Sequence, residues 1–193
     1  NQEDSIRLNA TRALGDEIEK LLSEPYTRFS EALAHFKQSY SDKKSLKGTA
    51  VTAIASHYLW AAEWLNIMTD QEIIEDHVDV FFANQVLREL ANDLRLVGEA
   101  LMASHKEGVH LSTERLLQLH QRLVWIFGAK LTYFERKRYA SLSNEPNKAM
   151  NLNSYIGLMG GNYREEETAS GMILVPVTKA EKADIVIPDT DFL

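Results

Sequence analysis

Leu87-Arg-Glu-Leu-Ala-Asn-Asp-Leu-Arg-Leu-Val-Gly-Glu-Ala-Leu101 is the stretch that decides the fold. Its apolar residues recur at spacings of three and four, close to a heptad seam: Leu87, Leu90, Leu94, Val97 and Leu101. An apolar stripe of this kind needs other helices to cover it. We therefore expect this stretch to lie in a long helix inside a helical bundle.

A capping pattern marks where that long helix begins. Thr69-Asp-Gln-Glu72 has the spacing of a capping box, in which the two side chains satisfy each other's backbone N–H groups. It predicts a helix that starts at Thr69 and runs to about Ser104.

Three further segments have helical periodicity. The first spans residues 4–40, and Pro25 predicts a kink in it or its division into two helices. The second spans residues 49–68 after a polar loop at 41–48. The last spans residues 113–140, with Ser112 as its N-cap. The fold class is therefore mainly α, an up-and-down bundle of four or five long helices.

The segment from Leu142 to Leu193 has a different composition and holds three of the four prolines. Two runs rich in β-branched residues, Gly171–Val177 and Asp184–Pro188, predict a short β-ribbon, and their prolines confine them to sheet edges. Arg164–Glu167 reads as a solvated charged stretch. We expect a helical bundle over residues 1–141 and a non-helical C-terminal extension over 142–193.

The charge and composition exclude some classes of protein and disfavour others. The net charge is −7, from 21 Lys+Arg and 28 Asp+Glu, which disfavours a protein that coats nucleic acid. No apolar run approaches the ~18 residues of a membrane span, and no secretory signal pattern is visible. Without cysteine there is no disulfide framework and no thiolate metal site. We expect a cytoplasmic protein with no membrane partner.

Arg115-Leu-Leu-Gln-Leu-His120 offers one candidate for catalysis. The Arg-x4-His spacing on a late helix resembles the signature of the HEPN ribonuclease family, although Leu116 stands where that family commonly has a polar residue. The resemblance implies a cleft between two protomers in which Arg115 and His120 cleave RNA without a metal. Five residues place the two side chains about 140° apart on a helix, so both reach one site only in a dimer.

Other polar residues indicate weaker alternatives. Arg136, Lys137 and Arg138 could contact phosphate at the end of the last helix, as in a nucleic-acid-binding accessory protein. Four histidines fall on different predicted helical segments: His35, His57, His77 and His120. No Glu-x-x-His or His-x3-His pair lies on a helix, so we expect no metal site and no cofactor.

The C-terminal extension offers apolar side chains for docking. The candidate partner-binding residues are Ile173, Val175, Ile185, Ile187, Phe192 and Leu193. An isolated two-stranded ribbon is marginal in water and needs a surface to lie on. Our leading prediction is a non-enzymatic assembly or adaptor protein. It would self-associate or join a larger complex through its bundle and this extension, with a homo-oligomer or another protein as partner.

Overall fold

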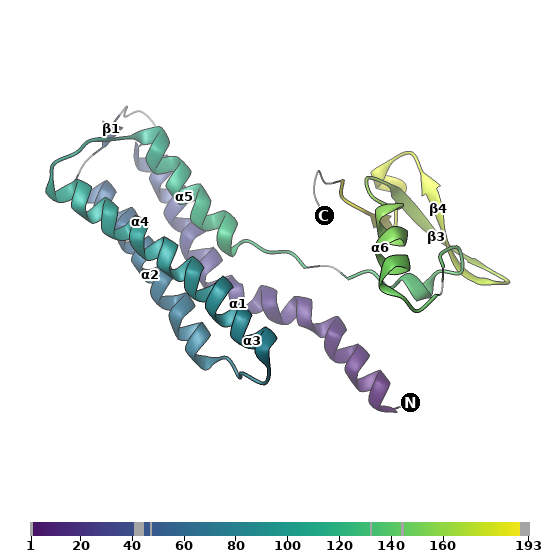
Figure 1. Cartoon of the computed structure of the whole chain (residues 1–193). Coiled ribbons are helices and arrows are strands. Elements are labelled where there is room, and N and C mark those ends of the chain that lie inside the picture. The colour runs from purple at the N-terminus through teal and green to yellow at the C-terminus, as the bar shows by residue number, and fades with distance from the viewer. Residues whose placement is uncertain (1, 41–44, 47, 132, 144, 190–193) are drawn as a thin grey trace. The chain divides into compact units, whose positions relative to one another are not determined.

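The computed structural model describes residues 2–40, 45–46, 48–131, 133–143 and 145–189 (Figure 1). The chain divides into two compact units, Asn1–Leu131 and Thr132–Leu193. The first unit is a bundle of helices, and the second carries a short helix and a three-stranded antiparallel sheet. The predicted fold class, mainly α with a C-terminal β element, is confirmed.

Long helices run alternately up and down the first unit: α1 (Gln2–Tyr40), α2 (Thr49–Gln71), α4 (Glu89–Lys106) and α5 (Thr113–Phe127). Two short elements join α2 to α4 at one end, the helix α3 (His77–Phe81) and a π-helix, η1 (Phe82–Arg88). At the other end β1 (Ser45–Leu46) pairs with β2 (Leu111–Ser112) (Figure 1). In the described part of the chain, no helix combines the length and the apolar character needed to cross a membrane.

The most extensive helix packing in this unit is between α2 and α4, and the predicted seam of α4 lies at this contact. Leu94 is completely buried and Leu101 is 6% exposed, while Leu87, Leu90 and Val97 pack on the same core from its edge. A Cβ atom at Gly98 would lie only 2.8 Å from Leu59 Cγ and 3.2 Å from the carbonyl oxygen of Ala55. The seam therefore faces α2, and small residues allow the two backbones to approach closely.

Pro25 does not divide the first helix, contrary to one of the two predicted outcomes. Helix α1 is continuous from Gln2 to Tyr40 with Pro25 inside it. The proline ring is fully buried, so its packing against the bundle offsets the backbone hydrogen bond that proline cannot make.

The predicted capping box at Thr69 is wrong. Thr69 lies in the last turns of α2, where its buried hydroxyl donates to the carbonyl oxygen of Leu65 at 2.7 Å. The capping box is instead Asp76 with Asp79, whose carboxylates accept from each other's backbone N–H groups. Burial of Thr69 extends α2, and the next helix begins only at His77.

The last bundle helix begins as predicted but ends early. The Ser112 side chain accepts from the N–H of Arg115 at 3.1 Å, as an N-cap does. Helix α5 stops at Phe127, and the following chain runs along α1, where Glu19 accepts from the N–H of Leu131 at 2.6 Å. The two compact units consequently divide after Leu131, before the boundary expected between residues 141 and 142.

The second unit is built on a sheet with strand order β4-β3-β5. Its strands are β3 (Asn162–Thr168), β4 (Gly171–Val177) and β5 (Ile185–Val186). The two predicted strands do not pair with each other. They form the edges, as their prolines require. The central strand β3 includes the charged stretch 164–167, which was expected to be solvated.

This unit has a hydrophobic core of its own. Tyr139, Leu158, Leu174 and Ile187 are all less than 9% exposed and form one cluster. The helix α6 (Lys148–Ile156) and the turns that follow it contribute Tyr155 and Met159 to the edge of the cluster. The C-terminal extension is therefore a small α+β unit and not a bare ribbon.

Candidate functional site

Three of the four helical histidines line one pocket in the helical unit. His35 comes from α1, His57 from α2 and His120 from α5, and the ring centroids of His57 and His120 are 6.3 Å apart. The pocket has a volume of about 460 Å³. Its remaining described lining residues are Arg28, Glu31, Ala32, Phe36, Tyr40, Ala50 and Ala53. The fourth histidine, His77, is exposed on α3 and does not line this pocket.

Burial makes two of these imidazoles weak bases. His120 is 5% exposed and its ring packs 4.7 Å from the ring of Phe36, centroid to centroid. Loss of solvent, reinforced by His57 and His35, lowers its pKa from 6.5 to about 4. Burial, with the positive charge of Arg28, also lowers the pKa of His57. Both rings are therefore neutral at pH 7.

The position of Arg28 is set by an aromatic ring. Its guanidinium carbon lies 4.4 Å from the ring centroid of Trp60, and the ring of Trp60 is in turn an edge-on neighbour of Phe29. Stacking occupies the face of the guanidinium and leaves its N–H groups, which lie in the plane, for acceptors at the edge. The pocket therefore has a permanent cation beside its titratable imidazoles.

The pocket residues do not form a metal centre. Within the described part of the chain, no three histidine, aspartate or glutamate side chains are placed to hold a metal ion. The Nδ1 atom of His57 is buried and has no hydrogen-bond partner among the residues that the structure describes. Leaving a buried polar nitrogen without a partner is destabilising.

Arg115 and His120 do not form a site within one chain. Arg115 is exposed near the start of α5, where its Nη1 lies 3.4 Å from the Gln118 side chain, whereas His120 is buried towards α1 and α2. Within the chain, the charged residues that share the pocket with His120 are Arg28 and Glu31, both on α1. This arrangement gives the HEPN-like pairing no geometric support within one copy.

The basic run at 136–138 lies in a 3-10 turn of the second unit and not on the last bundle helix. Arg136 is 5% exposed, and its guanidinium donates to the backbone carbonyls of Ser143 and Glu145. Arg138 pairs with Glu165 at 3.2 Å, and Lys137 is exposed. Arg136 therefore has a structural role in this turn, and its assignment as a phosphate contact stays a prediction.

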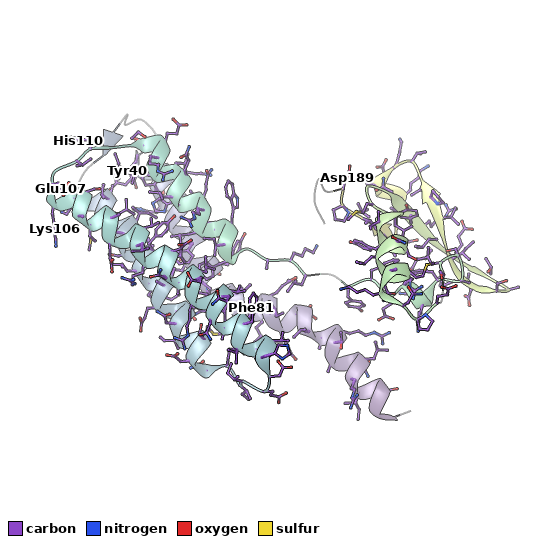
Figure 2. All side chains as sticks on the ribbon, in the orientation of Figure 1. Tyr40, Phe81, Lys106, Glu107, His110 and Asp189 are labelled. Carbon is purple, nitrogen blue, oxygen red and sulfur yellow. The ribbon has the colours of Figure 1, made fainter. Side chains whose placement is uncertain are left out.

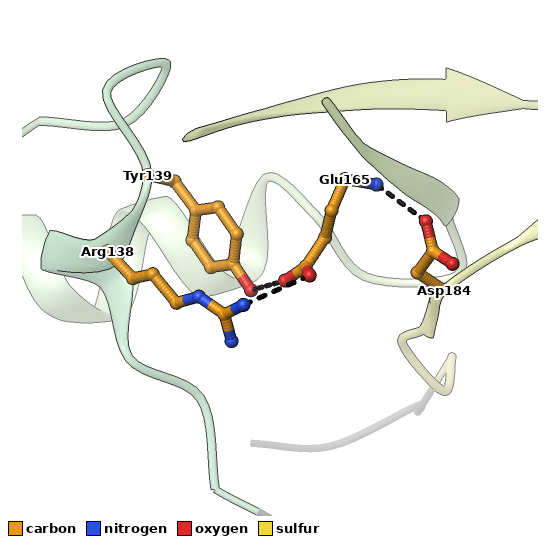
Figure 3. Close-up of polar contacts among 4 residues, drawn as sticks. All are labelled: Arg138, Tyr139, Glu165 and Asp184. Carbon is orange, nitrogen blue, oxygen red and sulfur yellow. Dashed lines mark hydrogen bonds and ion pairs between the residues drawn. The ribbon is translucent and has the colours of Figure 1, made fainter. Parts of the chain in front are cut away.

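Glu165 joins this turn to the central strand, as Figure 3 shows. Its carboxylate accepts from the Tyr139 hydroxyl at 2.5 Å and from Arg138, while its backbone N–H donates to Asp184 at 2.8 Å. Burial and the neighbouring Glu165 carboxylate raise the pKa of Tyr139 to about 12. Sequence reasoning missed Glu165 because an acidic run carries no signal for a central strand.

The candidate docking residues of the C-terminal extension have different environments. Ile187 is 4% exposed in the core of the second unit, and Ile185 packs against that core. Ile173 and Val175 flank the core residue Leu174 on β4, so they point to the opposite face of the sheet and are half-buried. Phe192 and Leu193 lie outside the described residues. Among the candidates that the structure describes, Ile173 and Val175 are the two that lie on the face opposite the core.

A larger apolar surface, which sequence reasoning missed, lies where α2 turns into α4. We call residues 67–86 the tip of the bundle, and most of their large apolar side chains are exposed: Ile67, Ile73, Ile74, Val78, Val80, Phe81, Phe82 and Val86. Phe81 is at the end of the bundle opposite Tyr40 (Figure 2). The sequence did carry one signal for this surface. The apolar residues around α3 cover more of the helix circumference than a single buried stripe needs, so some of them are left exposed.

The neutral state of His120 predicts a dependence of stability on pH. Between pH 6.5 and 4 the unfolded chain binds a proton at this residue that the folded chain does not. Stability should therefore fall as the pH falls, by up to about 1.4 kcal/mol per pH unit from one such group. Urea unfolding at several pH values across this range measures how the free energy of unfolding depends on pH. We expect His120→Gln to reduce this dependence and the exposed control His77→Gln to retain it. Equal slopes in all three proteins would contradict the prediction.

Comparison with known proteins identifies no relative of this chain: no protein-family model matches it, and neither does any curated protein or solved structure.

Proposed function

We propose that this chain is a non-enzymatic adaptor protein of the cytoplasm that joins a larger complex through the tip of its helical bundle. The observation that carries the proposal is the exposure of the tip. Ile73 is 79% exposed, Phe81 62% and Val78 57%. Large apolar side chains grouped in this way on a soluble unit are typical of protein–protein interfaces.

The charge of the tip favours a basic partner. Carboxylates of Asp70, Glu72, Glu75, Asp76 and Asp79 accompany the apolar side chains, and Arg88, the basic residue of η1, is paired with Asp70 at 2.8 Å. A second copy of the chain would bring like charges together at this surface, which is unfavourable. The occupant that best fits is an amphipathic helix with apolar residues on one face and lysine or arginine beside it.

The backbone of the tip supports the same conclusion. The π-helix η1 follows Phe81, and of its residues only Ala83 is buried. A π-helical turn is less stable than an α-helical one and is frequent at functional sites. Here it falls beside the exposed aromatic residues Phe81 and Phe82, so its cost is not offset by burial of those side chains.

A second surface lies on the sheet of the other unit. Ile173 and Val175 are on the face of β4 opposite the core, and Val186 on β5, the other edge strand, is 57% exposed. We propose this face as an additional contact for the same complex. It is smaller than the tip and is not needed for the test below.

Peptide binding to the full chain tests the adaptor function. The probe is a fluorescent amphipathic helix of leucine and lysine, and its counterpart of leucine and glutamate is the matched control peptide. We expect the lysine peptide to bind, and Phe81→Ser to weaken it at least about tenfold, the loss for a central aromatic anchor. Trp125→Ser, at a 73% exposed aromatic on α5, should leave binding unchanged.

Three outcomes would contradict the proposal. Absence of binding by the lysine peptide would remove the tip as a docking surface. Equal binding by the glutamate peptide would remove the charge argument. A mass of two copies by light scattering, reduced to one copy by Phe81→Ser, would replace the basic partner with a second copy of the chain.

A further inference from the structure

The pocket between α1, α2 and α5 has the size and lining of a small-molecule site, and it is independent of the docking function proposed for the tip. Its volume of about 460 Å³ falls within the range of ligand pockets, roughly 300–1,000 Å³. Part of its lining is apolar or aromatic and is contributed by Ala32, Phe36, Tyr40, Ala50 and Ala53. Such a wall favours a ligand with an apolar body.

The polar lining favours a negative group on that ligand. The charged and titratable residues that line the pocket are Arg28, Glu31 and His35 on α1, with Tyr40 at its end, His57 on α2 and His120 on α5. Among the described residues, no carboxylate forms an ion pair with Arg28, whose guanidinium is stacked on Trp60. An acidic ligand group would supply the partner that this cation lacks.

The imidazoles of His57, which is half-buried, and His120, which is buried, also favour an anionic group on the ligand. His57 and His120 both line the pocket, and their ring centroids lie 6.3 Å apart. An imidazole that takes up a proton can donate from both nitrogens to an anion. Burial and nearby positive charge lower the pKa of both rings, and an anion beside them would act in the opposite direction.

We propose that this pocket binds a small organic monoanion, with its carboxylate against Arg28, His57 and His120 and its apolar body against Phe36 and Tyr40. Glu31 is in the same lining and disfavours ligands that carry several negative charges, such as polyphosphates or nucleic acid. Binding is accompanied by uptake of protons on the imidazoles. The affinity therefore increases as the pH falls from neutrality towards the ordinary histidine pKa.

Calorimetric titration of the full chain with benzoate tests the site. Benzamide has the same ring without the charge, and inorganic phosphate has charge without the apolar body. We expect benzoate to bind at least about tenfold more tightly than either. Repeating the titration in buffers of different ionisation enthalpy should show net proton uptake. Failure of benzoate to bind, equal binding by benzamide or phosphate, or absence of proton uptake would each overturn the proposal.

Variants locate the bound carboxylate. Arg28→Gln changes an exposed side chain and should leave the fold intact while weakening benzoate at least about tenfold. His57→Gln should weaken it and reduce the proton uptake. Arg95→Gln on α4 and His77→Gln on α3 are the matched controls and should bind as the unaltered chain does. Unchanged affinity in Arg28→Gln would overturn the placement of the carboxylate, whatever the behaviour of His57→Gln.

Discussion

Leu94→Ala is expected to lower the free energy of unfolding of the helical unit by about 2–5 kcal/mol. The Leu94 side chain is completely buried in the seam between α4 and α2. Truncation removes its buried methyl groups and leaves a cavity that close-packed neighbours fill only in part. Urea unfolding followed by far-ultraviolet circular dichroism measures the change, because this unit holds most of the helix.

Leu96→Ala is the matched control for this prediction. Leu96 is on the same helix two residues away, but its side chain is 50% exposed, so the same truncation should cost less than about 0.5 kcal/mol. A similar loss in both variants would show that the seam residues do not face the core. A loss in neither would show that the α2–α4 pair is not the centre of the bundle.

Arg136→Ala is expected to destabilise the second unit by about 3–6 kcal/mol, from two hydrogen bonds to a charged donor at about 1.5–3 kcal/mol each. The guanidinium is buried and donates to the carbonyls of Ser143 and Glu145, which would lose these donors. This turn also precedes Tyr139, one of the core residues of the unit. Amide spectra of the full chain should show dispersed signals from the sheet strands disappear or broaden.

Lys137→Ala separates this structural role from a role in nucleic-acid binding. Lys137 is the exposed neighbour of Arg136 in the same turn, so its loss should leave the spectra of the second unit unchanged. If the run bound phosphate, both variants would weaken binding to an RNA probe and neither would unfold the unit. That result would reverse the assignment of Arg136.

Helix packing decides which of the candidate histidines meet in one site, and the sequence does not encode that packing. The histidines were known to fall on separate helical segments, but a periodic pattern does not say which helices are neighbours. His35, His57 and His120 meet because α1, α2 and α5 pack around one pocket, and His77 is excluded because α3 lies at the tip. No sequence pattern indicated Arg28 as a pocket residue, because its position depends on the ring of Trp60 on another helix.

Local signals proved reliable only where burial agreed with them. Ser112 is exposed and caps α5 as its sequence context predicts. Thr69 has an equally good pattern, but it is 4% exposed against the bundle and its hydroxyl bonds within α2 instead. Pro25 shows the same effect, because tertiary packing sustains a helix through a residue that disfavours it.

The amino-acid sequence by itself determined the helical class of this protein, the seam from Leu87 to Leu101, and the edge positions of the two proline-bearing strands. Each depends on periodicity or on backbone chemistry that acts within a few residues. Only the tertiary structure decided that the acidic segment around Glu165 is the central strand of a sheet. It also decided that Arg136 is buried, that the tip is exposed and that three histidines share a pocket. These features arise from contacts between segments far apart in the chain, and a local pattern does not encode which of those segments meet.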